Sequence, residues 1–477
     1  MIDHSVVSQI KLEDVSFHYQ EGTPDGVHHI NLNILPGECI LLCGKSGCGK
    51  TTITKLINSL IPYFDEGNKQ GTVFLEGKDI EELAMYQISD IVASVFQNPK
   101  SQFFNIEPES EIIFTIENQG LSLEVVENRL KETVEELKLK PLMNKTMFGM
   151  SGGEKQRIAF ACAFATNPDI IVLDEPTANL DSEATAQIAM VIAKLKAMGK
   201  TILIAEHRLS WLRALVDKVF LFQDGSLVEQ FSADVFFQKD DDWRQQHGLR
   251  QLYEGCHFHS QNGHAKFSRK LELKDLEVSY GSIPIIHDLN CTLYSGEVTA
   301  LIGCNGAGKT TLSRVLCGLH KETKGNVLFE GQKTSIKKRR ERSYLVMQDT
   351  NHQLFAESVE SECYLGNMAK QEDVDVLLKK FDLYQFKEKH PQTLSGGQKQ
   401  RLAIVTALLS QKDVLIFDEP SSGLDYENML RVSSMLRELA QKNCFILVVT
   451  HDTELIEASC DRCIRLENGR AVEIVSL

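Results

Sequence analysis

The sequence lacks any run of about 18 consecutive apolar residues, the length at which a helix spanning a bilayer is first expected. Residues 1–11 also lack the positively charged start and the following apolar stretch of a secretory signal. From these two absences we expect neither a transmembrane segment nor export of the chain.

An excess of basic residues is missing as well. Lys and Arg number 51 against 66 Asp and Glu, a formal net charge of −15. Proteins that bind nucleic-acid phosphates usually carry more positive than negative charge, so we do not expect nucleic acid as a partner. Hydrophobic residues make up 42% and charged residues 25%, which is ordinary globular composition. The 477 residues suit two or three domains better than one core.

Regularly spaced cysteine pairs are also absent. The 12 cysteines are scattered, and several lie in apolar runs, such as Cys39, Cys43 and Cys444. This distribution is typical of a reduced, cytosolic protein. Cys460 and Cys463 form a C-x-x-C pair, but no second pair or histidine set accompanies them, so a metal or redox role is the less favoured interpretation.

What the sequence does contain is an internal repeat. The motif Gly44-Lys45-Ser46-Gly47-Cys48-Gly49-Lys50-Thr51-Thr52 returns as Gly303-Cys304-Asn305-Gly306-Ala307-Gly308-Lys309-Thr310-Thr311. In the same order, Ser151-Gly152-Gly153 returns as Ser395-Gly396-Gly397, Asp174-Glu175 as Asp418-Glu419, and His207 as His451. The last three motifs recur after 244 residues (395 − 151, 418 − 174, 451 − 207), whereas the lysines recur after 259 (309 − 50). The chain is therefore a duplication whose first copy is longer between Lys50 and Ser151.

The repeat predicts one domain at residues 1–238 and a second at 271–477. Residues 239–270 are polar and include Asp240-Asp241-Asp242, so we expect a linker with room for one short helix. The linker also carries Cys256, with His257, His259 and His264 close to it in sequence. A metal site there is the alternative, and a solvated linker is favoured.

Each copy alternates short apolar runs with helical stretches. The runs 39–43, 170–173 and 201–205, with 298–302, 414–417 and 445–449 in the second copy, are typical of buried parallel strands. Residues 182–198 and 427–442 have the composition of helices. Alternation of this kind predicts an α/β fold with helices on the faces of a parallel sheet.

The glycine-rich motifs predict phosphate binding. Their glycines let successive N–H groups turn toward phosphate oxygens, Lys50 or Lys309 then reaches the β- and γ-phosphates, and Thr51 or Thr310 takes Mg²⁺. Asp174 and Asp418, each after an apolar strand, are suited to hold Mg²⁺ through water.

Two further pieces of a phosphoryl-transfer site follow. Glu175 and Glu419 stand next to the aspartates and can orient or deprotonate an attacking water. The serine–glycine motifs offer a hydroxyl and N–H groups at a helix start, where an anion is favoured.

Together these motifs resemble the ATP-binding-cassette (ABC) ATPase superfamily over essentially the whole of both units. The ordered set also includes Gln97 or Gln348 and Asp181 or Asp425. The resemblance implies two P-loop NTPase domains in tandem, each with a mostly parallel sheet, a helical subdomain and an N-terminal antiparallel β subdomain. It also implies ATP hydrolysis with Mg²⁺ bound near Thr51, Gln97 and Asp174, or Thr310, Gln348 and Asp418.

The resemblance further implies that each unit completes the nucleotide site of the other within the chain. One site would combine the following residues of unit one with Ser395 and Gly397: Lys50, Thr51, Gln97, Asp174, Glu175 and His207. The other would combine the following residues of unit two with Ser151 and Gly153: Lys309, Thr310, Gln348, Asp418, Glu419 and His451. His207 and His451 would bond the γ-phosphate. Tyr19 and Tyr280, which precede the two loops, would stack on adenine, with a core tyrosine as the alternative.

Two residues raise separate questions. Glu154 replaces the glutamine that the family usually has, as at Gln398. If its carboxylate faced ATP it would repel the phosphates, which leads to the hypothesis that the site using Ser151 binds more weakly or turns over more slowly. Cys48 lies within the first loop, so its alkylation is predicted to block that site unless it is only a buried filler.

The segments Gln97-Asn98-Pro99-Lys100-Ser101-Gln102-Phe103-Phe104 and Gln348-Asp349-Thr350-Asn351-His352-Gln353-Leu354-Phe355 resemble those of the ATPases of energy-coupling-factor importers, which take up vitamins or transition-metal ions. Glu206-His207-Arg208-Leu209 resembles that group too. The resemblance implies a protein at the cytoplasmic face of the membrane, paired with a transmembrane coupling component and a substrate-binding component. We expect the dock near 102–105 and 353–355. The alternatives are an ATPase of a sugar-type importer and a two-cassette ATPase acting on the ribosome.

Overall fold

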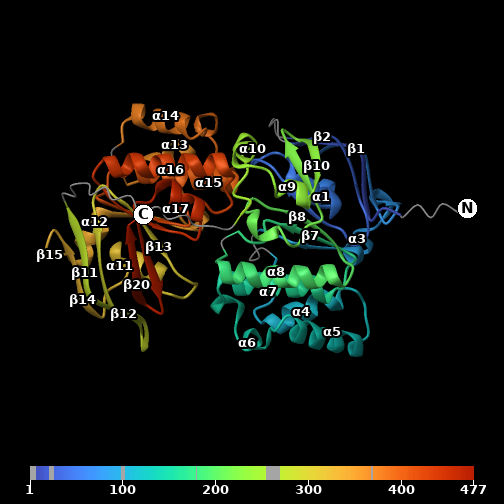
Figure 1. Cartoon of the computed structure of the whole chain (residues 1–477), viewed down its shortest axis with the longest axis horizontal. Helices are drawn as coiled ribbons and strands as arrows, with labels where there is room; N and C mark the ends of the chain where they lie inside the picture. The colour runs from blue at the N-terminus through green and yellow to red at the C-terminus, as the bar shows by residue number, and fades with distance from the viewer. Residues whose placement is uncertain are drawn as a thin grey trace, which may run out of the picture. The chain divides into compact units, whose positions relative to one another are not determined.

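The computed structural model describes residues 7–20, 26–97, 102–178, 180–253, 269–366 and 369–476. The chain divides into two compact units, of which unit one ends and unit two begins within the undescribed stretch 254–268. Both units contain sheets flanked by helices (Figure 1). Cys256, His257, His259 and His264 of the predicted linker lie outside the described residues.

Unit one contains ten strands and ten α-helices among its described residues. The strands are β1 (Ile10–Tyr19), β2 (Gly26–Ile34), β3 (Cys39–Cys43), β4 (Gly67–Leu75), β5 (Lys78–Asp79), β6 (Val92–Val95), β7 (Ile170–Asp174), β8 (Thr201–Ala205), β9 (Lys218–Gln223) and β10 (Ser226–Ser232). The helices are α1 (Lys50–Ile57), α2 (Leu60–Tyr63), α3 (Met85–Ile91), α4 (Pro108–Glu117), α5 (Leu123–Glu136), α6 (Lys140–Met143), α7 (Gly152–Ala165), α8 (Ser182–Ala197), α9 (Ala233–Phe236) and α10 (Asp241–Gln246).

Unit two repeats this order with fewer helices in its described part. Its strands are β11 (Lys270–Tyr280), β12 (Ile283–Tyr294), β13 (Val298–Ile302), β14 (Lys324–Phe329), β15 (Gln332–Lys333), β16 (Ser343–Val346), β17 (Val414–Asp418), β18 (Phe445–Val449), β19 (Arg462–Glu467) and β20 (Arg470–Ser476). Its helices are α11 (Lys309–Leu316), α12 (Ile336–Arg342), α13 (Val359–Tyr364), α14 (Gln371–Lys380), α15 (Gly396–Leu409), α16 (Tyr426–Gln441) and α17 (Thr453–Ser459).

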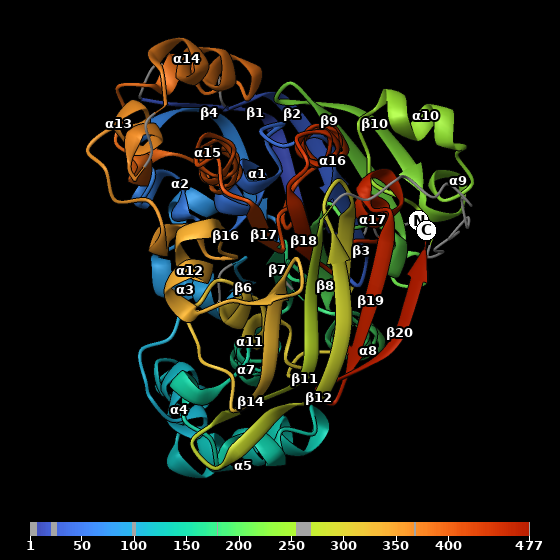
Figure 2. The same cartoon turned by 90° about the vertical axis from the view of Figure 1, so that its left-hand side faces the viewer.

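Each unit has a mostly parallel sheet and a smaller antiparallel one. The larger sheets have the orders β10-β9-β3-β8-β7-β6 and β16-β17-β18-β13-β19-β20. Only the pairs β9–β10 and β19–β20 in these sheets are antiparallel. The smaller sheets, β2-β1-β4-β5 and β12-β11-β14-β15, are antiparallel throughout. Figure 2 shows β11, β12 and β14 of the second one side by side. The predicted α/β class and its two sheet types are confirmed.

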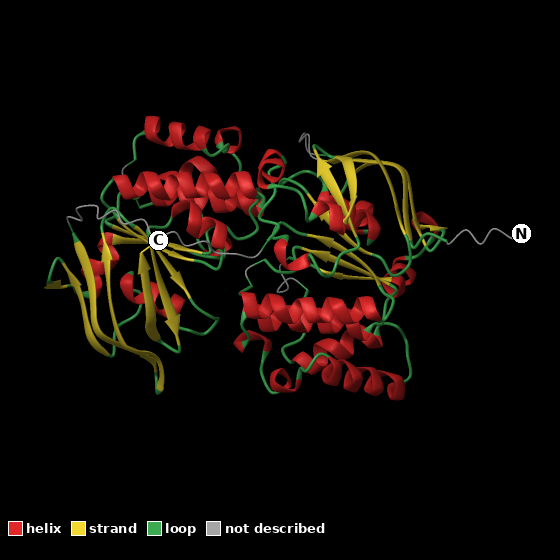
Figure 3. Cartoon of the chain, in the orientation of Figure 1, coloured by secondary structure: helices red, strands yellow, loops and turns green. Residues whose placement is uncertain are grey.

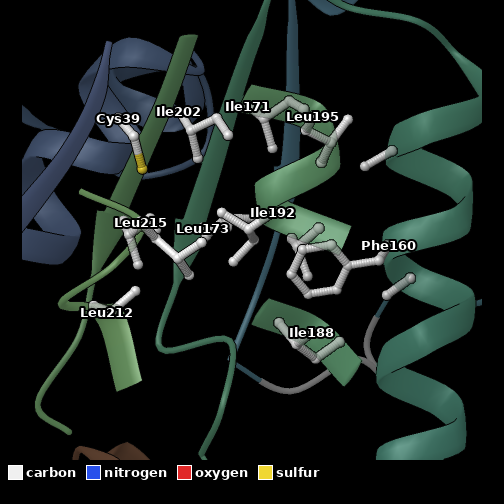
Figure 4. Packing of buried hydrophobic residues seen from close by; sticks show 14 of the residues in the cluster. Cys39, Phe160, Ile171, Leu173, Ile188, Ile192, Leu195, Ile202, Leu212 and Leu215 are labelled. Carbon is white, nitrogen blue, oxygen red and sulfur yellow. The ribbon is translucent and has the colours of Figure 1, made fainter. Parts of the chain in front are cut away.

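Buried apolar side chains explain why the predicted strands form the larger sheet. Every side chain of β3 and β8 is buried, as expected of parallel strands covered on both faces. In Figure 4, Ile171 and Ile202 of the sheet face Ile192 of α8, and Phe160 of α7 closes the same cluster. The alternation of strand and helix that produces this layering is visible in Figure 3.

The extra length of the first copy lies in three places. The short helix α2 and the 3₁₀ turn Ile80–Glu82 have no counterpart in the described part of unit two. Helix α5 has 14 residues, whereas α14 has 10. Helices α4 and α5 pack on α7, as α13 and α14 pack on α15, so both units have a helical subdomain.

Residues 239–253 pack on unit one. The predicted short helix is α10, which lies beside α9 and β10 (Figures 1 and 2). The Trp243 ring meets Phe231 of β10 edge-on at 5.6 Å. Leu249 and Leu252 belong to the core of this unit. This part of the predicted linker is therefore structured.

No helix among the described residues is long and apolar enough to cross a membrane. The same residues contain no cluster of three or more metal-binding side chains. Cys460 and Cys463 are both buried, and burial raises the pKa of Cys460 to about 12, which suits inert thiols.

Candidate nucleotide sites

In each unit the predicted site residues follow neighbouring parallel strands. In unit one the glycine-rich loop follows β3, Gln97 follows β6, Glu175 follows β7 and His207 follows β8. Because the carboxyl ends of parallel strands meet at one edge of the sheet, these residues converge there, where open α/β sheets bind ligands. The corresponding strands of unit two are β13, β16, β17 and β18.

The phosphate loop of unit one needs glycine at two tight points. A Cβ on Gly44 would lie 2.2 Å from the carbonyl oxygen of Phe222, and one on Gly49 would lie 2.6 Å from Val27. Both residues have positive φ, which favours glycine. Lys50 begins α1, and its Nζ donates to the carbonyl oxygens of Gly44 and Lys45 at 3.0 Å. The lysine is thus held across the mouth of its own loop, where a phosphate would lie.

Unit two builds the same loop. Gly303 and Gly308 adopt the same positive φ as their counterparts, 147° and 103° against 144° and 102°. Lys309 donates to the carbonyl oxygens of Gly303 and Cys304. The remaining predicted loop residues lie in the same two turns or in the first turn of the following helix: Ser46, Gly47, Thr52, Asn305, Gly306, Ala307 and Thr311.

A hydroxyl and a carboxylate meet beside the loop of unit one. The Thr51 hydroxyl donates to the Asp174 carboxylate over 3.2 Å. Oxygen donors of this kind suit Mg²⁺. Burial raises the pKa of Asp174, and it raises that of Asp418 in unit two to about 6, so a bound cation would offset the cost of ionising either carboxyl.

Glu175 lies at the centre of the candidate site in unit one. Its carboxylate accepts a hydrogen bond of 2.5 Å from the Gln97 side-chain amide and lies 3.5 Å from His207 Nε2. Burial, followed by the charges of Asp174 and Glu206, raises the pKa of Glu175 to about 8. Burial and the positive charge of Lys50 lower the pKa of His207 well below its usual value. The structure thus brings together a carboxyl group and a neutral imidazole, as a site for water activation requires.

Unit two has the same carboxyl–imidazole pair with different neighbours. His451 Nε2 lies 3.7 Å from Glu419, and Thr450 donates to Glu419 over 3.3 Å. The residue at the position of Thr450 in unit one is Glu206, which accepts a hydrogen bond from Thr177. Burial raises the pKa of Glu206 to about 7. Unit one therefore has a second buried carboxyl group near its site, which the repeat alone did not reveal.

Comparisons with known proteins agree with this geometry. The ABC transporter family model matches residues 27–178 and 286–422. Two proteins of Treponema denticola, both provisionally named as ABC transporter ATP-binding proteins, are 42% and 38% identical over 97% of this chain and 96% of theirs. A similarly named Clostridium perfringens protein is 30% identical over 97% of this chain and 90% of its own. The chain belongs to the ABC transporter family.

Solved structures support the tandem fold of this ABC ATPase. A chain in a structure of ribosome-bound archaeal Pelota and ABCE1 matches with a TM-score of 0.70 and 24% identity, over 97% of this chain and 78% of that one. A solved RNase-L inhibitor matches with a TM-score of 0.61 and 22% identity, over 98% and 91%. These likenesses concern the fold alone. Family membership makes the chain an ATP-binding, ATP-hydrolysing protein.

The serine–glycine motifs of the ABC ATPase begin helices α7 and α15. Ser151 Oγ accepts from the Glu154 N–H, and Glu154 Oε2 accepts from the Ser151 N–H at 2.9 Å. Ser395 and Gln398 form the same reciprocal cap. The N–H groups of Gly152 and Gly153, and of Gly396 and Gly397, lie in first helical turns, which lack intrahelical acceptors.

The cap gives Glu154 a structural role. Its other carboxylate oxygen accepts from Lys145 Nζ at 2.6 Å. Burial raises the pKa of Glu154, but the bonds from Lys145 and Ser151 outweigh it and leave that pKa below its usual value. The hypothesis of repulsion assumed a carboxylate that faced ATP, whereas this one is turned toward its own helix and a lysine.

Aromatic and thiol side chains near the loops differ between the units. The Tyr19 hydroxyl lies 3.2 Å from the Thr52 hydroxyl, beside the loop, whereas the Tyr280 ring lies 4.5 Å from the His320 ring. Cys48 is buried, 3.6 Å from Lys50 Nζ, which favours the filler interpretation over a reactive thiol. Among the cysteines that the structure describes, the exposed one is Cys304, in the second loop.

A repeated loop follows β6 and β16 in the helical subdomains. The side-chain amide of Gln102 accepts from the Phe96 N–H and donates to the Ser94 carbonyl oxygen. Gln353 does the same with Met347 and Leu345. Each amide thereby extends the edge of the strand that precedes it.

A buried glutamate accepts hydrogen bonds from the backbone of each loop. We did not identify these two glutamates from the sequence. Glu111 accepts from the N–H groups of Phe104 and Asn105, and Glu362 accepts from those of Phe355 and Ala356. The available signal was spacing, because each glutamate follows its loop glutamine by nine residues in both copies (111 − 102, 362 − 353).

Proposed function

We propose that this ABC ATPase powers a membrane importer of the energy-coupling-factor type, which takes up a vitamin or a transition-metal ion. In this proposal the chain lies at the cytoplasmic face of the membrane and binds a transmembrane coupling component, which joins a substrate-binding component. The repeated loop around Gln102 and Gln353 is the observation that carries the proposal.

The proposed reaction places one ATP in each phosphate loop. Lys50 or Lys309 binds the β- and γ-phosphates. Glu175 or Glu419, in its ionised form, orients a water molecule and accepts its proton as the water attacks the γ-phosphorus. The bond to the β,γ-bridging oxygen then breaks, which releases ADP and phosphate. Mg²⁺ held beside the Thr51–Asp174 or Thr310–Asp418 pair would neutralise phosphate charge. Before cleavage, His207 or His451 would donate a hydrogen bond to the γ-phosphate.

The proposal includes pairing of the two units. Ser151 with Gly153, and Ser395 with Gly397, would bond the nucleotide that the other unit holds. The capped helix starts support this role because their unbonded N–H groups and the helix dipole favour an anion.

The loop offers a docking surface in each unit. Phe104 is 79% exposed and Phe355 is 73% exposed, although both are large apolar side chains. Their backbones are held by Glu111 and Glu362, so each phenylalanine projects from a fixed support. Exposed apolar side chains on a rigid support are typical of a surface that a partner covers.

A cavity adjoins the loop of unit one. It has a volume of about 260 Å³ and is lined by Gln102, Phe103 and Glu111, together with residues of α3, β6, α4 and α7. Phe104 and Phe114, whose rings lie 5.6 Å apart, stand at the same loop. A short helix of a transmembrane subunit could insert an apolar side chain here.

Co-purification tests the proposal. The tagged chain is expressed in its native cells, extracted in mild detergent, and compared with a Phe104→Ala/Phe355→Ala double variant. We expect integral membrane proteins with the parent chain and their loss with the double variant, while ATP binding is retained. Met190→Ala, which removes a 65% exposed side chain from α8, is the matched control and should retain the partners. A chain that is recovered with ribosomes and no membrane protein would refute the proposal.

A further inference from the structure

A buried arginine lies close to the proposed nucleotide site of unit one and has no role in it so far. Arg250 is only 4% exposed and stands in the stretch after α10 that was expected to be linker. A buried guanidinium group keeps its positive charge, so it acts on the charged groups around it.

The fold fixes the path of the chain that leads to Arg250. Asp240 caps α10 by accepting from the Trp243 N–H at 2.8 Å. Buried Arg244 then donates to the Leu249 carbonyl oxygen at 2.8 Å, and its own carbonyl oxygen accepts from the Leu249 N–H at 3.0 Å. The chain therefore reverses direction just after the six-residue helix α10, in a short turn that ends at Leu249.

That turn contacts the phosphate loop. Gly248 has a φ of +65°, and a Cβ placed on it would lie 2.6 Å from Cε of Lys45. The backbone of Gly248 therefore lies directly against a side chain of the loop. Glycine favours both this backbone conformation and this close approach, because any other residue would be strained at this φ and would push the Lys45 side chain aside.

Arg250 also acts on the histidine of the site. The charges of Lys50 and Arg250 both disfavour protonation of His207, which is itself buried. Lys45, beside Gly248, and Lys50 and Arg250, both near His207, thus bring three positive charges to this loop and imidazole, close to the carboxyl groups of Asp174 and Glu206. A cluster of cations at a phosphate loop is complementary to a polyphosphate.

We propose that residues 240–250, here called the terminal segment, form a wall of the nucleotide site in unit one, where Arg250 adds a cation near the γ-phosphate and Gly248 supports Lys45. This inference rests on the nucleotide placement proposed above. Arg250 acts as a positioning residue, because its charge reaches the terminal phosphate beside His207. The affinity for ATP, which carries the γ-phosphate, therefore depends on Arg250 more than the affinity for ADP does.

The test uses the full chain with Lys309→Ala, so that nucleotide binding reports on unit one. The dissociation constants of fluorescent ATP and ADP analogues are measured with Arg250, Arg250→Gln and Arg250→Lys. We expect Arg250→Gln to weaken the ATP analogue about tenfold, equivalent to about 1.4 kcal/mol. The ADP analogue should weaken less than about threefold, and Arg250→Lys should recover most of the loss because it keeps the charge. Arg213→Gln, which removes an exposed arginine of the same unit, is the charge-matched control and should change neither constant.

The possible failures are distinct. Unchanged ATP binding in Arg250→Gln, or an equal loss for both analogues that lysine does not rescue, would overturn the role of Arg250 and leave the proposed function intact. No ATP binding by the Lys309→Ala chain with Arg250 present would overturn the nucleotide site of unit one itself.

A second pair of variants tests the wall independently. Gly248→Ala should weaken ATP binding because its methyl group meets Lys45. The same substitution should reduce ATP affinity by a smaller factor in a Lys45→Ala background, where that clash is relieved. Equal costs in the two backgrounds would contradict the contact.

Discussion

Removal of the buried carboxylate of Glu111 should loosen the docking loop without damage to the nucleotide loop. All three donors to Glu111 converge on Oε2: the N–H groups of Phe104 and Asn105, at 3.1 and 2.6 Å, and the Asn105 side-chain amide at 3.1 Å. A buried donor that loses its acceptor costs about 1–3 kcal/mol. Two backbone donors lose their acceptor, but both hydrogen bonds are only partly buried and water offsets part of the loss, so we expect Glu111→Ala to reduce the free energy of local opening by about 2–4 kcal/mol.

Amide hydrogen exchange measures this opening locally. A loss of about 2 kcal/mol corresponds to roughly 30-fold faster exchange at residues 104 and 105. Glu111→Gln keeps an oxygen acceptor but loses the negative charge, so its exchange rate at these residues should lie between those of Glu111→Ala and the parent. The equivalent loop at Phe355 and Ala356, held by Glu362, is an internal control in the same molecule. Unchanged exchange at residues 104 and 105 in Glu111→Ala would refute the reasoning.

Three other predictions follow from the two sites. Because burial and neighbouring acidic groups raise the pKa of Glu175 from 4.5 to about 8, the folded chain keeps a proton that the unfolded chain loses, and stability falls as pH rises through that window. In nucleotide-free thermal unfolding, Glu175→Gln should therefore raise Tm over the parent more at about pH 8.5 than at about pH 5, and a gain that shrinks with pH would contradict this. A maleimide should label exposed Cys304 well before buried Cys48, and ATP should slow the labelling. Mass spectrometry that finds Cys48 labelled first would disprove the assignment. Glu154→Gln should leave the ATPase rate within about twofold, because glutamine makes the same cap at Gln398, and a large gain in rate would revive the idea of repulsion.

Much of the fold could be predicted because the relevant signals are local. The run 39–43 is strand β3 and 201–205 is β8, since both consist of apolar residues buried on both faces. The glycine-rich loops are equally predictable from the sequence, because their positive φ angles and close backbone contacts favour glycine at fixed spacing.

Other features depend on contacts between distant residues and carry no local signal. The pairing of Thr177 with Glu206, 29 residues apart, is a packing outcome that the motif around His207 does not encode. The polarity of residues 239–253 pointed to a linker, but Trp243 and Leu249 suffice to anchor the segment in the core of unit one. The sequence leaves open which way Glu154 faces, because it does not show that Lys145 and the helix start already bind both of its carboxylate oxygens.

The central claim is that this single chain holds two nucleotide sites of the same construction. It is tested most directly by the amount of ATP bound per chain in a Glu175→Gln/Glu419→Gln variant, in which the proposed bases are removed and ATP should persist. We predict about two ATP per chain, and about one after the addition of either Lys50→Ala or Lys309→Ala. One ATP or fewer in the double variant, or two in either lysine variant, would contradict the claim.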